Sequence, residues 1–215
     1  MNNGTSLAIT ISAAKGDTIV VYFSCTTGAA GVSSISDGSS PPNVYVQGPV
    51  QNTNVRNEIW YCLNAPNAPT TTLTVNYATA TEAAAVVETY TGVIGVGATG
   101  SGSGSSTAPA VTVVTTQPNS WVVMCVGGTV SSAWSATGPN EFWHAITSAA
   151  TGGPIRTGSF DGGNVSSTGS DTVTGTFGTT CTWGTVGLEL LSLDFEDDSL
   201  PPARPAPADP IVSVW

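Results

Sequence analysis

The most constraining feature of the sequence is a strongly apolar stretch that occurs twice, each time after an alternating stretch and a short turn. In Val111–Gly128 (VTVVTTQPNSWVVMCVGG) the apolar part is Trp121–Cys125. Near the N-terminus, Leu7–Ile11 alternates, Lys15–Asp17 turns the chain, and Thr18–Phe23 is apolar on both faces. Alternation is typical of a strand buried on one face, and a continuous apolar run is typical of a strand covered on both. The two copies predict packed sheets rather than a helix bundle.

Other stretches have the composition of strands in both halves of the chain. Thr71–Tyr77 alternates cleanly. Thr81–Val93 combines a run of alanines with β-branched residues, but its length and its lack of a helical apolar stripe favour a strand. The remaining expected strands are Val32–Ser36, Val44–Val46, Glu58–Leu63, Glu141–His144, Arg156–Phe160, Thr172–Phe177 and Thr182–Leu191. We therefore predict an all-β fold, a two-layer antiparallel β-sandwich of jelly-roll-like type.

The order of expected strands suggests two pseudo-repeated halves, at about residues 1–94 and 107–193. Strands from the two halves could equally interleave in one jelly roll. Gly95–Ser106 is almost wholly Gly, Ser, Ala and Thr, a composition typical of a flexible linker between the halves. A length of 215 residues suits one large β-domain, so we predict a single sandwich over residues 1–193.

Residues 194–215 differ in kind from the rest of the chain. Asp194–Asp198 is an acidic cluster, and five prolines then follow within ten residues. Proline at this density favours an extended, semi-rigid chain and prevents regular strand pairing. The segment ends in the apolar stretch Ile211–Trp215, and a tryptophan left in water would expose a large apolar area. We predict an arm that binds a partner through Pro205, Pro207, Pro210, Ile211, Val212, Val214 and Trp215.

The charge balance argues against some classes of partner. Fourteen acidic against four basic residues give a net charge of −10, which repels nucleic acid and anionic membrane surfaces. Met1–Ser6 has no basic run followed by an apolar stretch, and no run of about 18 apolar residues occurs. We expect no signal peptide, synthesis in a cytoplasm, and neither nucleic acid nor membrane as a partner.

No catalytic residue is predicted. A glycosidase needs two carboxylates on either side of a cleft, whereas the acidic residues in the body of the chain are isolated. The single histidine, His144, follows Phe142 and Trp143 in an expected strand, and no GxSxG motif is present. A carboxylate pair that meets only in the folded chain stays open as a rival interpretation, with Asp37, Glu58, Glu88, Asp161 and Glu189 as the isolated acids.

No metal or cofactor site is predicted either. The cysteines are Cys25, Cys62, Cys125 and Cys181, and none has the close spacing that a zinc site needs. We expect them to be buried reduced thiols, although one or two disulfides remain open. The acidic cluster at the start of the arm lacks the spaced ligands and glycine of a calcium loop.

Aromatic side chains could bind a sugar. Trp60, Trp121 and Trp183 lie in apolar strands, where a large ring is expected to fill the core. Trp134 and Trp143 lie in or near a loop-rich region and are the candidate ligand-binding residues.

Several short motifs resemble a β-sandwich unit of phage virion proteins and bacterial surface proteins. They are the turn and strand in Lys15–Phe23, the strand Ile59–Tyr61, and the segments Val86–Val93, Thr115–Val123 and Val186–Leu191. The resemblance covers about residues 5–193 and has no catalytic motif. It implies a structural or adhesive part, and the arm lies outside it.

The resemblance and the arm together predict a non-enzymatic structural protein on the surface of a phage particle. We expect a capsid decoration or cement subunit that attaches through its C-terminal arm to neighbouring subunits such as the major capsid protein, and that forms a homo-oligomer, with a trimer as our guess. The alternative is a receptor- or glycan-binding module of a phage tail fibre or bacterial surface adhesin. The sequence leaves open the host, the location in capsid or tail, and the oligomeric state.

Overall fold

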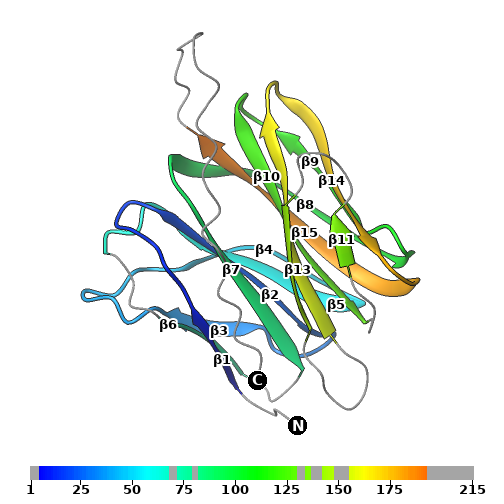
Figure 1. Ribbon diagram of the computed structural model, residues 1–215, viewed down its shortest axis with the longest axis horizontal. Helices are drawn as coiled ribbons and strands as arrows, with labels where there is room; N and C mark the ends of the chain where they lie inside the picture. The colour runs from blue at the N-terminus through cyan, green and yellow to red at the C-terminus, as the bar shows by residue number, and fades with distance from the viewer. Residues whose placement is uncertain are drawn as a thin grey trace.

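The computed structural model describes residues 5–67, 72–78, 82–129, 134–136, 142–147 and 155–192 (Figure 1). This part of the chain contains strands and loops only, so it includes no helix that could cross a membrane. The strands are β1 (Ser6–Thr10), β2 (Thr18–Thr26), β3 (Val32–Ser36), β4 (Val46–Thr53), β5 (Val55–Cys62), β6 (Thr72–Tyr77), β7 (Ala83–Tyr90), β8 (Val93–Ser106), β9 (Ala110–Thr115), β10 (Ser120–Thr129), β11 (Trp134–Ala136), β12 (Phe142–Thr147), β13 (Ile155–Val165), β14 (Gly169–Phe177) and β15 (Cys181–Ser192).

The described strands form four antiparallel sheets. Two are large: the four-stranded β4-β5-β2-β7 sheet and the five-stranded β12-β13-β10-β15-β8 sheet, which we call the central sheets. Two are small: the β1-β6-β3 sheet and the β11-β14-β9 sheet, which we call the outer sheets. The small sheets lie at opposite sides of the molecule with the central sheets between them (Figure 1).

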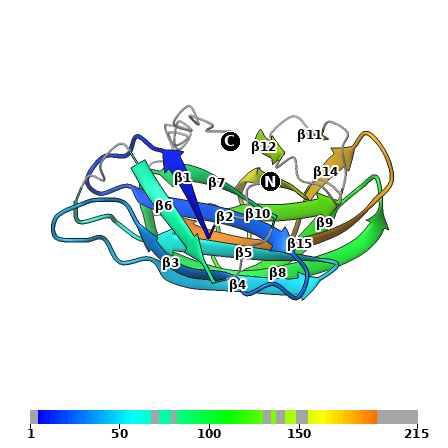
Figure 2. The same cartoon turned by 90° about the horizontal axis from the view of Figure 1, so that it is seen from below.

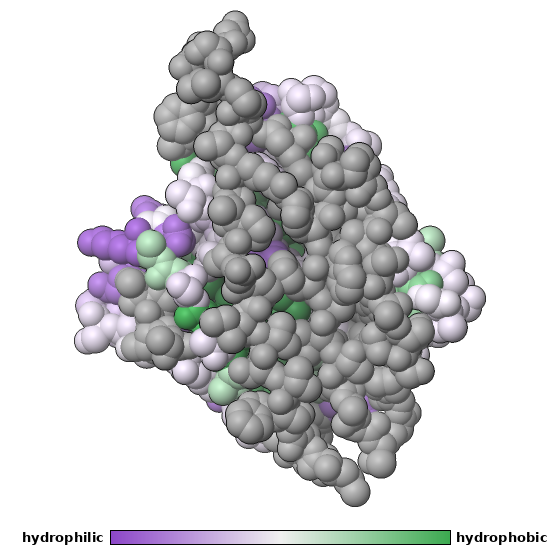
Figure 3. Space-filling model, in the orientation of Figure 1, coloured by the Kyte–Doolittle hydropathy of each residue, from purple (hydrophilic) through white to green (hydrophobic). Residues whose placement is uncertain are grey.

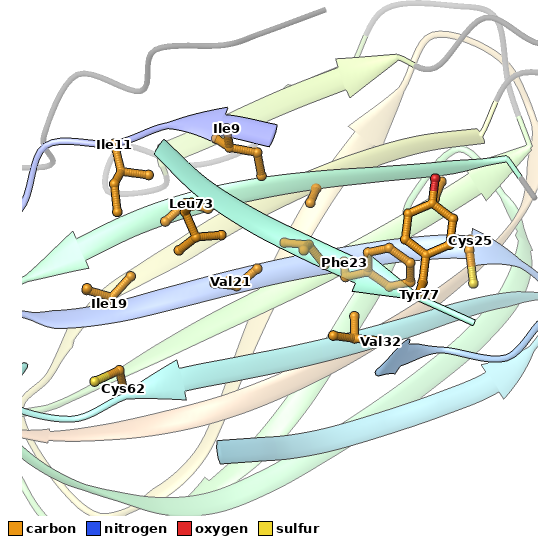
Figure 4. Close-up of a cluster of buried hydrophobic side chains, with 14 of the residues drawn as sticks. Ile9, Ile11, Ile19, Val21, Phe23, Cys25, Val32, Cys62, Leu73 and Tyr77 are labelled. Carbon is orange, nitrogen blue, oxygen red and sulfur yellow. The ribbon is translucent and has the colours of Figure 1, made fainter. Parts of the chain in front are cut away.

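Three hydrophobic cores separate these layers. The first, which includes Ile9, Phe23 and Leu73, lies between the β1-β6-β3 sheet and the four-stranded central sheet (Figure 4). The second lies between the two central sheets, and the third between the five-stranded sheet and the β11-β14-β9 sheet. Because β2 and β10 each lie between two cores, both of their faces are buried, as their continuous apolar runs predict. The predicted all-β sandwich is confirmed, built as four layers rather than two.

The two halves of the chain have the same topology. In the N-terminal half, β2 pairs with β5 and β7, and β6 pairs with β1 and β3. In the C-terminal half, β10 pairs with β13 and β15, and β14 pairs with β9 and β11. Every strand pair of the described residues joins two strands from β1–β7 or two from β8–β15. The repeat expected from the strand order is therefore present as a topological repeat, and the described strands of the two halves do not interleave.

The segment predicted as a flexible linker is instead strand β8, so that prediction is wrong. Its Gly and Ser residues alternate along an antiparallel ladder with β15. A Cβ atom added at Gly100 would lie 2.2 Å from the carbonyl oxygen of Thr112, and one at Gly102 would lie 2.7 Å from that of Ala110. Glycine is needed here because the backbone of the β9 region passes over this face, whereas in isolation the same composition resembles a linker.

Other predicted strands are confirmed with small changes of boundary. The ambiguous segment Thr81–Val93 contains strand β7, and the alternating segment Thr71–Tyr77 contains β6. The expected strand at Val44–Val46 begins only at Val46, because the residues before it form a loop held by Asp37.

Candidate functional site

Among the side chains that the structure describes, four carboxylates are buried: Asp37, Glu58, Glu88 and Glu189. Burying an ionised carboxylate is costly unless hydrogen bonds or an opposite charge replace its hydration. These four groups are therefore the candidate functional carboxylates, and the hydrogen bonds of each show which parts of the structure it connects.

Asp37 organises the loop between β3 and β4. Its Oδ1 accepts hydrogen bonds from the backbone N–H of Ser39 (3.1 Å) and the Ser39 hydroxyl (2.6 Å), and its Oδ2 accepts from Asn43 Nδ2 (2.7 Å) and the Tyr45 hydroxyl (2.9 Å). Burial alone would raise the pKa of this carboxyl, but the hydrogen bonds outweigh it and lower the pKa below its ordinary value. Asn43 also donates to the carbonyl of Asn67 (2.9 Å), so the network ties two loops together.

Glu58 lies on β5 and faces the first core. The Arg56 guanidinium contacts its Oε1 at 2.5 Å, and its Oε2 accepts from the Trp60 indole N–H (2.7 Å) and from Gln47 Nε2 (3.2 Å). A Cβ atom at Gly31 would lie 1.6 Å from Glu58 Oε1, so the loop before β3 covers this carboxylate closely. Glu58 is thus fully enclosed and paired with a cation.

Glu88 belongs to the interface between the two halves, which we call the seam. Its Oε1 accepts from the Ser159 hydroxyl of β13 (2.6 Å), and its Oε2 accepts from the Tyr90 hydroxyl (2.7 Å), which lies 3.0 Å from the Tyr22 hydroxyl. A second polar group in the seam joins Ser24 to Asn57 (2.7 Å). Both groups place hydrogen bonds inside an otherwise apolar interface, which fixes how the halves pack.

Glu189 lies on β15 and faces the outer sheet of the C-terminal half. Its Oε1 accepts from the backbone N–H groups of Thr116 (2.8 Å) and Gln117 (3.2 Å). Its Oε2 accepts from the backbone N–H of Ala98 (2.8 Å) and the Thr116 hydroxyl (2.9 Å). Burial acts to raise the pKa, but these hydrogen bonds together lower it. Glu189 fastens the turn after β9 to β8.

The four networks do not share a hydrogen-bond partner among the described residues. They also lie in different places: one at a loop, one in the first core, one in the seam and one under the outer sheet. In each of these places the hydrogen bonds of the carboxylate hold loops or layers together.

Asp171 on β14 is the exception to this pattern. Its Oδ2 is buried and has no hydrogen-bond partner among the described groups. Burial is the main cause of its raised pKa, opposed by a hydrogen bond from the backbone N–H of Thr172. A single carboxylate of this kind is a local cost to stability rather than a site.

The four cysteines are free and buried, as expected. Burial raises the pKa of the Cys25 and Cys125 thiols to about 12 and that of Cys181 to about 11, so none of these is an activated nucleophile. Among the described residues, no group of three or more potential metal ligands occurs.

The predicted binding residues fall in two classes. Trp134 and Trp143 lie in the short strands β11 and β12, which belong to different sheets, rather than in loops. The arm residues Pro205, Pro207, Pro210, Ile211, Val212, Val214 and Trp215 lie outside the described residues. Trp121 and Trp183 are buried in the cores, as predicted from their apolar strands.

The described surface has few exposed apolar side chains. On the face drawn in Figure 3 the described residues are mostly pale, with small separate green and purple areas. Val44 (73% exposed) and Val46 (47%) lie near the outer edge of β4, and Val114 (62%) lies on an outer sheet. Along that edge β4 lies next to β8 (Figure 2), and Gln51 donates to the carbonyl of Gly102 (3.3 Å).

No family model, curated protein or solved structure matches this chain.

Proposed function

We propose that this protein is a non-enzymatic structural subunit of a phage particle, of the decoration or cement type. Its body is a rigid support, and its C-terminal arm attaches it to neighbouring subunits such as the major capsid protein. The observation that supports this proposal best is the set of three continuous cores, which joins four sheets into one body and uses the buried carboxylates to hold its loops and layers.

The body has the properties that an attached shell subunit needs. Charged side chains make up only 8% of the whole chain, and four of the acids in the body are held by internal hydrogen bonds. Because both central sheets are covered on both faces, separating any two layers would expose a large apolar area. Such a body resists local opening while it is held at one end.

The arm has the composition of an attachment segment. Burying Trp215 and two aliphatic side chains would contribute several kcal/mol at roughly 25 cal/mol per Å² of apolar area. Ordering a flexible segment costs about 1–2 kcal/mol per residue, and proline lowers that cost because the free chain is already extended. Repetition of the contact over a symmetric shell would raise the effective affinity further.

Co-sedimentation with capsids that lack the protein tests this proposal. We expect the full chain to sediment with the capsids, and a chain without Pro201–Trp215, or with Trp215→Ala, to stay in the supernatant. Val114→Ala is the matched control, because it removes an exposed apolar side chain from the body and should still sediment. Unchanged sedimentation of the truncated chain would contradict the proposal. Binding of a surface glycan that Trp143→Ala abolishes would favour the receptor-binding alternative.

A further inference from the structure

The two halves are joined by one short connection, and they share no strand pair in the part of the chain that the structure describes. β7 ends at Tyr90 and β8 begins at Val93, so Thr91 and Gly92 link the halves. Each half has a core of its own between a central and an outer sheet, and the third core is the one that the halves share. The described part of the seam is therefore held by side-chain packing and side-chain hydrogen bonds, without a backbone ladder across it.

The packing across the seam is symmetric when the halves are exchanged. β5 packs against β10 and β15, and the corresponding strand β13 packs against β2 and β7. β4 packs against β15, and the corresponding strand β12 packs against β7. An interface in which each contact has a counterpart with the partners exchanged is the type that forms between two identical subunits. The seam is thus built like a dimer interface inside a single chain.

The Asn57 side chain fits a notch formed by two glycines of the other half. Gly127 and Gly184 are paired on β10 and β15, and a Cβ atom added to them would lie 2.5 Å and 2.7 Å, respectively, from the Asn57 amide group. At the corresponding position of the C-terminal half, the Thr157 hydroxyl donates to the carbonyl of Ala84 (3.4 Å). Both contacts form equally well whether the two halves belong to one chain or to two. The N-terminal half therefore recognises a C-terminal half by shape and hydrogen bonding.

The connection between the halves lies on the surface. Thr91 and Gly92 are exposed, and Gly92 has a φ of +81° with no atom within 4 Å of an added Cβ. The Thr91 hydroxyl donates to Asp17 Oδ1 (3.0 Å). The pairing of β8 with β15 is irregular where β8 begins, with a register shift between Leu191 and Ser192. The connection can therefore extend without disturbing the core of either half.

We propose that two copies of this chain exchange halves. The N-terminal half of each copy packs against the C-terminal half of the other, which gives a dimer with two seams made of the same residues as the seam of one chain. A short connection between two packed units favours such an exchange. Exchange takes place during folding, before the seam closes, because opening a closed seam would expose the core between the central sheets.

The exchanged dimer goes beyond the proposed function. Its contacts are those of the seam, so its formation does not depend on the arm. If the arm attaches the protein to a capsid, a step that rests on the proposed function, the dimer attaches at two points and binds more tightly than one chain.

The conformation of Gly92 provides the first test. A β-branched residue is strained in the left-handed region, so Gly92→Val disfavours the tight connection of the monomer, whereas the extended connection of the dimer accepts valine. We expect the fraction of dimer, measured by light scattering after refolding at high protein concentration, to rise about tenfold or more over that of the wild-type protein.

Gly28→Val is the matched control. Gly28 has a φ of +80° with no atom within 4 Å of an added Cβ, and it lies in a loop within the N-terminal half. This variant should be strained to a similar degree without any rise in the dimer fraction. Monomers for both variants at every concentration, or an equal rise in both, would overturn the proposal.

Complementation between two variants shows whether the dimer has exchanged seams. Ser159→Glu alone places a second carboxylate against Glu88, and Glu88→Ser alone leaves only hydroxyl groups there. In an exchanged dimer of the two chains, one seam has the native pair and the other has a single carboxylate facing a hydroxyl. We therefore expect the two chains, refolded together, to form a heterodimer with one copy of each, detected by native mass spectrometry.

The double variant Glu88→Ser/Ser159→Glu in one chain is the control, and it should fold without a partner. Separate monomers in the mixture, with the double variant folded, would contradict the exchange. If the double variant does not fold, the comparison of the two glycines decides alone. Failure of the capsid sedimentation test while the heterodimer forms would contradict the function of the arm and leave the exchange standing.

Discussion

The two halves of the molecule reach the same topology by different chemistry. In the N-terminal half the buried Glu88 points into the seam and is bound by hydroxyl groups, and in the C-terminal half Glu189 points outward and is bound mainly by backbone N–H groups. The C-terminal half also has β8, a glycine-based strand over which a backbone passes closely. The shared strand pattern therefore sets the topology, while each half contains different positions at which a substitution is expected to destabilise the fold.

The sharpest test of this difference is Gly100→Val in β8. The new Cβ would lie 2.2 Å from the backbone oxygen of Thr112, which cannot move without shifting β9. Overpacking against backbone costs about 3 kcal/mol or more. The matched control is Ser101→Val, whose side chain is exposed on the other face of the same strand and should change stability by less than about 0.5 kcal/mol. Urea unfolding measures both, and equal midpoints would show that β8 does not need glycine.

Strand β8 is difficult to recognise in the sequence, whereas β2 and β10 are easy to recognise. Continuous apolar runs identify β2 and β10 because a strand that is buried on both faces needs apolar residues at successive positions. The glycines of β8 hide the strand instead. A strand over which another backbone passes closely has no room for the β-branched or aromatic side chains by which strands are recognised. The alternation of Gly and Ser in Gly100–Ser105 has a period of two residues, and this period is the signal in the sequence that indicates a strand.

The polar networks could not have been predicted from the sequence for a different reason. Glu88 meets Ser159, and Glu189 meets Thr116, each more than 70 positions away. The isolation of these acids along the chain is visible, but their partners become neighbours only when the sheets stack. An isolated acid within an apolar strand is the one signal that could have marked them as buried and hydrogen-bonded.

The second test compares the two glutamates by replacing each with glutamine. Glu189→Gln places an amide NH₂ against backbone N–H donors that cannot reverse, so we expect a loss of about 2–3 kcal/mol. Glu88→Gln faces the hydroxyls of Ser159 and Tyr90, which can rotate to accept, so we expect about 1 kcal/mol or less.

The pH dependence of the difference in stability between the wild-type protein and Glu189→Gln provides an internal control. Because the folded-state pKa of Glu189 lies below its ordinary value of 4.5, its stabilising effect is present above pH 4.5 and is lost as the pH falls below that value. The difference in the free energy of unfolding between the wild-type protein and Glu189→Gln should therefore become smaller as the pH falls below 4.5. Equal losses for the two glutamines at pH 7 would show that the type of donor does not distinguish the halves.

The smallest expected effect, and the one with opposite signs in the two halves, compares Asp171→Asn with Asp37→Asn. Burial raises the pKa of Asp171, so the folded state favours the protonated form, and stability contributed by this group is lost as the pH rises above the ordinary value of 3.8. Its buried Oδ2 has no partner among the described groups, so removing the charge should stabilise the protein by about 1 kcal/mol at pH 7.

Hydrogen bonds lower the pKa of Asp37 despite burial, so its contribution is present above pH 3.8 and Asp37→Asn should destabilise. Chemical unfolding of both variants at pH 7 and below pH 3.8 measures the two signs. If both substitutions destabilise equally at pH 7, then Asp171 is held by interactions that compensate for its burial, and the C-terminal half satisfies its carboxylates as fully as the N-terminal half does.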